Sequence, residues 1–387
     1  CLLEKDPEDV LAELKDADDD PDYQAFLEKN KYWLTPYATF RAIKDLLGEG
    51  PWQEWPDAYA RFSPGLARRV ELADGLDRHR KLQYEFQREW DELRAYANAR
   101  GIKIVGDMPM YVSGDSSDVW AERDIFELDE RGYAQVQAGC PGDGFDPEGQ
   151  LWGNPTYRWD VLAARGYDWW LARLERAVKT YDYVRLDHFI GFSSYYKIAK
   201  GKPAREGSFS FGPGLDLFRA AYQKLGPLPF IAEDLGVITP AVRALIAETG
   251  IPGMDIVQFS DGDVREGYEP KPDTVTFTGT HDNQTLLGFC QSRFGLEGQE
   301  ATQMADRIAA SVLASKNDVA IMPLQDVLGL DDAARMNVPG VAEGNWSWQA
   351  AWEDVVAATG RLAQMAQASG RFREASAQAL RGGTFAP

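Results

Sequence analysis

Three carboxylates stand at the ends of three different predicted strands. They are Asp187, Glu233 and Asp282, and 46 and 49 residues separate them, about one strand–helix unit each. In glycosidic-bond chemistry, one carboxylate attacks the anomeric carbon and a second carboxyl group protonates the leaving oxygen. A third can hold the sugar hydroxyls while positive charge develops on the ring. These residue types at this spacing therefore predict a site that acts on glycosidic bonds.

Two other interpretations of the same residues stay open at this level. Each acid taken alone has an ordinary structural role available, as a salt-bridge partner or as a cap at a strand end. The chain has three histidines, and two of them, His188 and His281, directly flank Asp187 and Asp282. These four side chains are possible ligands for zinc or manganese. No close His-x-x-x-His pair supports such a site, so glycosidic chemistry is favoured and no metal is predicted.

The carboxylates need elements to carry them, and the sequence repeats a helix followed by a short apolar strand. Apolar side chains at helical spacing predict helices over 82–97, 169–180, 215–225, 239–250 and 297–315. Continuously apolar runs predict strands over 102–107, 183–187, 230–234, 254–259, 274–278 and 319–323. Such runs are typical of parallel sheets that are buried on both faces.

A serial pattern of this kind favours either a doubly wound sheet or a (β/α)8 TIM barrel. No G-x-G-x-x-G or G-x-x-x-x-G-K-[ST] run follows these strands, which disfavours nucleotide-binding folds. Polar residues gather at the strand ends, where barrel enzymes keep their chemistry. The prediction is therefore an α/β barrel. Six of its eight strands are counted, so the other two are expected upstream of Cys1.

Two further segments carry signals of their own. Residues 1–80 have a polar, helical pattern with an aromatic cluster, which is either core packing or a sugar-stacking surface. The cluster consists of Tyr32, Trp33, Tyr37 and Phe40. Residues 138–159 are rich in Gly, Pro and aromatic side chains, which predicts a long loop. Such a loop either covers a site or is purely structural, and a substrate-covering role is favoured.

Charge and cysteine content limit the classes of partner. The 387 residues include 41 Lys and Arg against 61 Asp and Glu, a formal net charge of −20. Nucleic acids, anionic membrane surfaces and polyanionic substrates are therefore disfavoured, whereas a neutral sugar is not. No apolar run approaches the length of a membrane span. Three scattered cysteines are too few for a disulfide framework, so a reducing, cytoplasmic compartment is expected.

Five motifs resemble those of one enzyme family and occur in that family's order. They are Gly-Asp-Met-Pro-Met-Tyr-Val at 106–112, Gly-Gln-Leu-Trp-Gly-Asn-Pro at 149–155, Arg-Leu-Asp-His-Phe at 185–189, Ala-Glu-Asp-Leu-Gly at 232–236 and Thr-Gly-Thr-His-Asp-Asn at 278–283. The family is that of the amylomaltases, disproportionating 4-α-glucanotransferases related to the α-amylases, and the resemblance extends over 23–349. It implies a (β/α)8 barrel with helical insertions, of which this chain carries strands 3–8. Residues 1–80 would be an inserted helical subdomain, and 81–387 the barrel portion with 138–159 as its covering loop.

The resemblance also implies residue roles. Asp187 would be the nucleophile, Glu233 the general acid/base and Asp282 the transition-state stabiliser. Substrate-binding and carboxylate-orienting roles would fall to Asp107, Arg185, His281, Trp152, Asn154 and Asn283.

The implied activity is transfer of α-1,4-glucan segments between maltooligosaccharides by a retaining double displacement, without a cofactor. Hydrolysis of α-1,4-glucans is the alternative within enzymes, and an inactive glucan-binding remnant is the alternative if the chain is natively truncated. An N-terminal segment that completes the barrel is expected. We accordingly expect residues 1–387 alone to be insoluble or molten.

Overall fold

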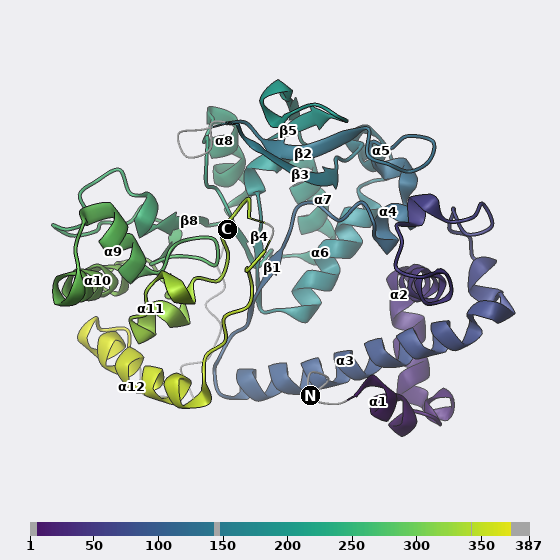
Figure 1. Ribbon diagram of the computed structural model, residues 1–387, viewed down its shortest axis with the longest axis horizontal. Coiled ribbons are helices and arrows are strands. Elements are labelled where there is room, and N and C mark those ends of the chain that lie inside the picture. The colour runs from purple at the N-terminus through teal and green to yellow at the C-terminus, as the bar shows by residue number, and fades with distance from the viewer. Residues whose placement is uncertain (1–5, 143–147, 342, 373–387) are drawn as a thin grey trace. The chain divides into compact units, whose positions relative to one another are not determined.

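The computed structural model of the chain describes residues 6–142, 148–341 and 343–372. It divides into two compact units, one ending at Leu228 and the other beginning at Pro229. Figure 1 shows the N-terminal unit from purple to teal and the C-terminal unit from green to yellow. No helix in the described part of the chain combines the length and the apolar character needed to cross a membrane.

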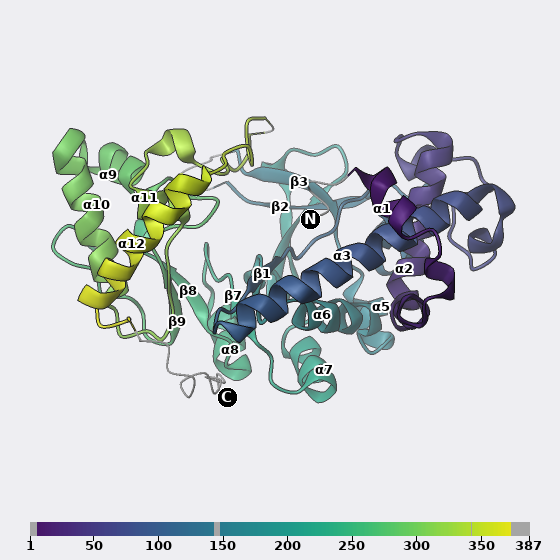
Figure 2. The same ribbon diagram turned by 90° about the horizontal axis from the view of Figure 1, so that it is seen from below.

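Long helices dominate the first part of the N-terminal unit. Its helices are α1 (Pro7–Glu13), α2 (Pro21–Leu47), α3 (Ala73–Ala99), α4 (Ser117–Ala121), α5 (Trp159–Ala164), α6 (Asp168–Thr180) and α7 (Leu215–Leu225). The chain enters α1 with Asp6 as the cap, whose carboxylate accepts from the Glu8 amide at 2.9 Å, and with Pro7 in the first turn. Helices α2 and α3 pack against each other (Figure 2).

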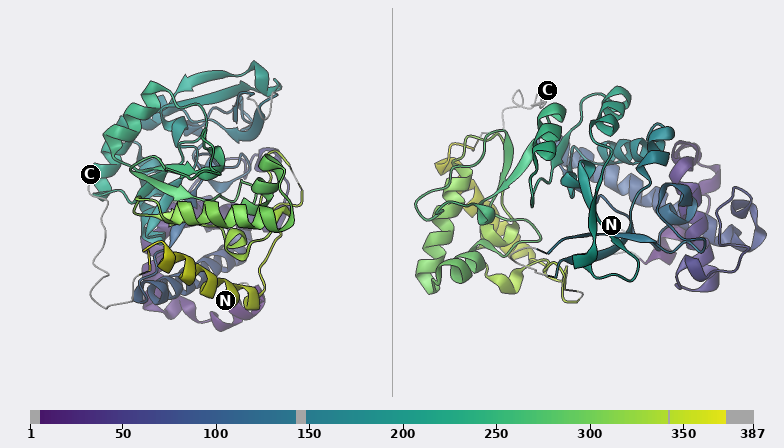
Figure 3. Two further views of the ribbon diagram at one scale, coloured as in Figure 1. Left: turned by 90° about the vertical axis from the view of Figure 1, so that its left-hand side faces the viewer. Right: turned by 90° about the horizontal axis from the view of Figure 1, so that it is seen from above.

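The N-terminal unit also contains two kinds of strand pairing. β1 (Val105–Met108) and β4 (Tyr183–Leu186) are parallel, as predicted for 102–107 and 183–187. β2 (Val136–Cys140), β3 (Gln150–Pro155), β5 (Ser194–Ala199) and β6 (Ser208–Phe211) form an antiparallel sheet in the order β3-β2-β5-β6. This sheet lies at the top of the unit in Figure 1 and in the left view of Figure 3.

The antiparallel sheet corrects one expectation from the sequence. Residues 138–159 were expected to be a loop, yet they include the end of β2 and all of β3; residues 143–147 within them lie outside the described residues. The pairing depends on glycine, because a Cβ on Gly139 would collide with the carbonyl of Gln150 on β3. A glycine-rich sequence looks like a loop, but here the missing side chain lets two backbones approach.

The C-terminal unit is built from parallel strands and helices. Its strands β7 (Phe230–Ala232), β8 (Gly253–Ile256), β9 (Thr274–Phe277) and β10 (Ala320–Ile321) pair in that order. Its helices are α8 (Pro240–Thr249), α9 (Leu286–Phe294), α10 (Gly298–Leu313), α11 (Leu324–Leu328) and α12 (Trp352–Ala368). All four predicted strands are present, although 257–259 is a 3-10 turn rather than part of β8. Parallel strands alternating with helices in this way fit an α/β barrel-like fold.

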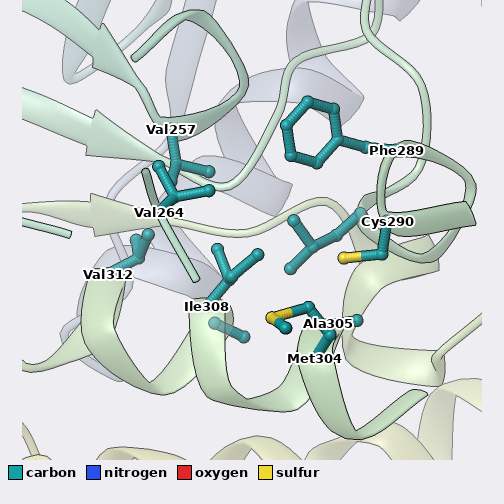
Figure 4. Close-up of a cluster of buried hydrophobic side chains, with 10 residues drawn as sticks. Val257, Val264, Phe289, Cys290, Met304, Ala305, Ile308 and Val312 are labelled. Atoms are coloured by element: carbon teal, nitrogen blue, oxygen red, sulfur yellow. The ribbon is translucent and has the colours of Figure 1, made fainter. Parts of the chain in front are cut away.

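The core of the C-terminal unit joins the segment after β8 to α9 and α10. Its members are buried apolar side chains: Val257, Val264, Leu286, Phe289, Cys290, Met304, Ala305, Ile308, Ala309 and Val312 (Figure 4). Helix α10 supplies one face of this cluster, because Met304, Ile308 and Val312 recur every four residues. This packing fixes α9, which follows directly on the loop that carries Asp282.

The register of β1 on β4 depends on a glycine. Asp107 is paired with Arg185, and Gly106 precedes it on β1. A Cβ on Gly106 would overlap the ring of Tyr181, the residue that caps the end of α6.

We expect Gly106→Ala to lower the free energy of unfolding by about 1–3 kcal/mol, because the Tyr181 ring must move to make room. Urea denaturation at fixed pH measures this loss. Gly50→Ala is the matched control, since a Cβ there meets no atom within 4 Å. Equal denaturation midpoints for the two variants would contradict the expectation.

Candidate active site

An ion-paired cluster lies at the carboxyl ends of β1 and β4. Nη1 of Arg185 donates to both carboxylate oxygens of Asp107, at 2.8 and 2.9 Å, and to Oδ1 of Asp187 at 2.9 Å. The Arg185 side chain is only 12% exposed, while both carboxylates are about 40% exposed. The mostly buried arginine therefore fixes the positions of the two carboxylates, which remain accessible to solvent at the strand ends. The structure thus brings together three residues that the sequence predicted for one site.

Aromatic side chains adjoin this cluster within the same unit. His188 follows Asp187 directly, and the ring of Trp152 on β3 lies edge-on to it, with ring centres 5.0 Å apart. The Tyr111 ring lies 6.3 Å from His188 and 6.1 Å from Trp152. Asn154 is held beside them, because its Nδ2 donates to the carbonyl of Val112 at 2.9 Å. The predicted covering segment therefore contributes one aromatic ring beside His188 and one amide held in place by the main chain.

The backbone at His188 is in the left-handed region, with φ of 49°. Asparagine is among the residues that adopt this conformation most readily, so His188→Asn should keep the chain path. Burial lowers the pKa of the His188 imidazole to about 4. Its pKa in the unfolded chain is about 6.5.

This difference predicts a pH-dependent loss of stability. Between pH 6.5 and 4 the unfolded chain binds a proton at His188 that the folded chain does not, so stability falls as the pH falls. The loss should reach about 2–3 kcal/mol near pH 4 and should be absent above pH 7. Urea denaturation at pH 7.5 and 4.5 tests this, and His188→Asn should flatten the difference by that amount. An unchanged pH dependence in the variant would rule out His188 as its source.

Glu233 follows β7 and is held by its own turn. Its side chain is buried, and Oε1 accepts from the Leu235 amide at 3.2 Å. The neighbouring Asp234 points elsewhere, because its Oδ1 accepts from the Met254 amide on β8 at 2.7 Å. Gly253 makes room for that carboxylate, since a Cβ there would lie 2.5 Å from it. Of this acidic pair, Asp234 ties β7 to β8 and Glu233 lies beyond the strand end.

Two carboxylates, one buried and one partly exposed, hold the loop that follows β9. Asp326 of α11 accepts from the Thr278 hydroxyl at 2.6 Å and from the Leu286 amide at 2.7 Å. Burial raises the pKa of Asp326. Asp332 accepts from the Thr285 amide at 2.9 Å and from Nε2 of Gln284 at 2.6 Å. Both ends of the 278–286 loop are therefore anchored on charged groups.

Asp282 lies within this anchored loop and is oriented from three sides. Its Oδ1 accepts from Nδ2 of Asn337 at 2.6 Å, and its main-chain oxygen accepts from Arg335 at 2.8 Å. Nε2 of His281 lies 3.2 Å from Oδ2 of Asp282. The His281 ring in turn lies 5.2 Å from the ring of Trp346. The structure therefore places the predicted pair His281 and Asp282 in one cluster.

Asn283 shapes the same loop. Its Oδ1 accepts from both the amide and the hydroxyl of Thr280, at 2.9 and 2.8 Å. Asn337 and Arg335 were missed by sequence reasoning, because more than fifty residues separate them from Asp282 and no motif links them. Among the described residues, no group of three His, Cys, Asp or Glu side chains has the arrangement to hold a metal ion.

Strand-end carboxylates with orienting histidines, arginines and aromatic faces on a barrel-like α/β scaffold define a class of sugar-processing enzyme. The comparisons with known proteins agree. The 4-alpha-glucanotransferase family model (glycoside hydrolase family 77) matches residues 5–354. The 4-alpha-glucanotransferase of Streptococcus pneumoniae serotype 4 is 42% identical over 366 residues, 90% of this chain and 72% of that protein. The Thermus thermophilus 4-alpha-glucanotransferase is 39% identical over 374 residues, 90% of this chain and 75% of that protein.

A solved structure gives the same result. The amylomaltase of Streptococcus agalactiae in complex with acarbose superposes with a TM-score of 0.83 at 36% identity, over 91% of this chain and 74% of that one. The chain belongs to the 4-alpha-glucanotransferase family, and it is a glycosyl-transferring enzyme of that class.

Proposed function

We propose that the chain transfers α-1,4-glucan segments by a double displacement in which Asp187 is the nucleophile. Asp187 attacks C1 of the donor glucan, and Glu233 protonates the departing glycosidic oxygen, which leaves a covalent glycosyl-enzyme. Glu233 then takes the proton from the 4-hydroxyl of a second glucan, whose oxygen displaces Asp187. Two inversions retain the configuration, and Asp282 stabilises the charge that develops on the ring.

One observation carries this assignment. Arg185 binds Asp187 and Asp107 together at adjacent strand ends, which places a positive charge beside the Asp187 carboxylate and holds it in a defined orientation. A nucleophile in a double displacement needs both properties. Asp107 and Arg185 are thus proposed as orienting residues.

The remaining predicted residues are proposed to meet the substrate. Trp152 offers an apolar face to a sugar ring, and His281 offers a ring nitrogen beside Asp282. The amides of Asn154 and Asn283 are proposed to bind sugar hydroxyls from positions that their main-chain hydrogen bonds fix.

Maltotriose separates transfer from its alternatives. Transfer produces glucose and a ladder of longer maltodextrins, and isotopically labelled glucose added as an acceptor enters the longer products. Hydrolysis produces only shorter products and leaves the label in free glucose. Binding without turnover would favour the non-catalytic alternative. The Asp187→Asn variant is the blank for the turnover measurements.

We also propose a finer description of the fold, in which β1 and β10 are the edges of a barrel that two further strands complete. Residues 1–80 would be an inserted subdomain, and 81–387 the portion with strands 3–8. Exposed apolar side chains on α3, the helix before β1 in the chain, support this: Phe86 and Leu93 are 44% and 54% exposed, although the apolar stripe of 82–97 predicts burial. A soluble monomer of residues 1–387 with a sharp thermal transition and full transferase activity would contradict this description.

A further inference from the structure

The aromatic cluster of residues 32–40 separates into two parts in the structure. Phe40 is core, because it is buried against Trp55 and Trp120. Tyr32 is 55% exposed, and Trp33 and Tyr37 are only partly buried. The active-site proposal makes no use of these three aromatic residues.

These residues line two adjoining cavities in the N-terminal unit. One, of about 570 Å³, lies between α2, α4 and α6, and the other, of about 650 Å³, lies between α2, α3 and α6. Tyr32 and Arg176 line both, so the two cavities adjoin, and we call the pair the α2–α6 groove (Figures 1 and 2 show its helices). Each cavity has the size of a small-ligand site, and together they suit a linear ligand of several rings.

The first cavity presents aromatic rings on opposite walls. The ring of Trp33 on α2 packs 6.2 Å from that of Tyr37, and the guanidinium of Arg176 on α6 lies 4.9 Å from the centre of the Trp33 ring. On α6, Trp169 lies with Arg173 5.5 Å from its ring centre. Such rings stack on the apolar faces of pyranose sugars.

Polar groups are interleaved with the rings. Asp118 of α4, Gln83 of α3 and Tyr37 of α2 line the same cavity. Burial raises the pKa of the Asp118 carboxyl, so this group faces little bulk water. Pro36 also lines the cavity, and because proline has no N–H, the carbonyl of Tyr32 lacks its usual helical partner. The groove therefore offers both hydrogen-bond acceptors and donors.

The walls of the groove are fixed before any ligand binds. Nη2 of Arg176 donates to Oε1 of Gln87 at 2.6 Å, which joins α6 to α3. Nη1 of Arg173 donates to the carbonyl of Met110 at 3.0 Å, which joins α6 to the segment after β1. Binding to a groove built in this way needs little ordering of the protein.

We propose that the α2–α6 groove is an accessory binding site for an α-glucan chain. Carboxylates and cationic side chains both line it, so an anion or a cation would meet like charge, whereas sugar hydroxyls both donate and accept. A wholly apolar ligand would strip water from these charges without replacing it. The choice of a glucan as the neutral sugar rests on the proposed function, since a second site on a glucan transferase would hold the distal part of the same polymer.

Tyr32→Ala tests the groove with little risk to folding, because this side chain is exposed and lines both cavities. Tyr222→Ala is the matched control, since Tyr222 is 52% exposed on α7 and lines neither cavity. Both changes are made in the Asp187→Asn protein, and maltohexaose binding is measured by titration calorimetry. Thermal melting of each variant confirms that it is folded.

Two classes of maltohexaose site are expected in the Asp187→Asn protein. Tyr32→Ala should weaken one of them by about three- to tenfold, the effect of losing one stacking ring, while Tyr222→Ala leaves both unchanged. In the otherwise unaltered enzyme, Tyr32→Ala should raise KM for amylose and leave turnover of maltotriose unchanged.

A single class of site, or equal effects of the two tyrosine changes, would overturn the accessory site. If maltotriose is still disproportionated in that case, the failure belongs to the groove alone. If the enzyme neither binds maltohexaose nor acts on maltotriose, the proposed function fails as well.

Discussion

Asp187→Asn is expected to lower transferase turnover by at least about a thousandfold while maltooligosaccharide binding persists. The amide cannot form the glycosyl-enzyme, but its Oδ1 can still accept from Arg185, as Asp187 Oδ1 does at 2.9 Å. The shape of the cluster at β1 and β4 is therefore kept. Initial rates on maltotriose and calorimetric binding of maltohexaose measure the two effects separately.

The exposed Asp216 of α7 provides the control, since Asp216→Asn also removes one negative charge from the N-terminal unit. That variant should keep the parent rate. Residual transfer above a few per cent in Asp187→Asn would remove Asp187 from the nucleophile role, and lost binding would show that the variant disturbed the site itself.

Glu233→Gln is expected to slow maltotriose turnover by about a hundred- to ten-thousandfold, the range for loss of a general acid/base. The amide oxygen can still accept from the Leu235 amide, so the side chain should stay in place. α-Glucosyl fluoride carries a leaving group that needs little protonation. Its first step should therefore be spared, and a burst of fluoride equal to the enzyme concentration should precede a slow phase.

Glu248→Gln on α8 is the matched control, because Glu248 is exposed in the same unit, and it should behave as the parent enzyme. If the Glu233→Gln variant handles α-glucosyl fluoride no better than maltotriose, Glu233 is not the acid. A steady fast release without a burst would show that Glu233 is not needed as the base of the second step.

The strand–helix repeat was predictable because each unit is local. Its periodicity, its caps and its apolar runs are all found in consecutive residues, as with Thr239 and Pro240 at the start of α8. The antiparallel sheet was not predictable in the same way, since β2 pairs with β5, more than fifty residues away. Its glycines make close backbone approach possible, but in a sequence they look the same as glycines in a loop.

The candidate site also contains residues that the sequence predicts and residues that only the fold brings together. Asp107, Arg185 and Asp187 follow from strand ends and motif resemblance, and the ion pairs among them confirm that they share one cluster. The partners that orient Asp282 could not be found from sequence, because Asn337 meets it only through the fold. The side chains that we propose to act on the substrate lie in short motifs, whereas those that hold Asp282 in place are far from it in the sequence.

The shared hydrogen bonds of Arg185 have a consequence for the proposed catalytic cycle. When Asp187 becomes a glycosyl ester, it loses its negative charge, and a guanidinium bound to it alone would be left without a counter-ion. Both carboxylate oxygens of Asp107 accept hydrogen bonds from the same nitrogen of Arg185, Nη1, at 2.8 and 2.9 Å. In the proposed cycle, Arg185 therefore keeps Asp107 as an anionic partner throughout both half-reactions. The charge of Asp187 can then be lost and restored while the residues at the two strand ends stay in place.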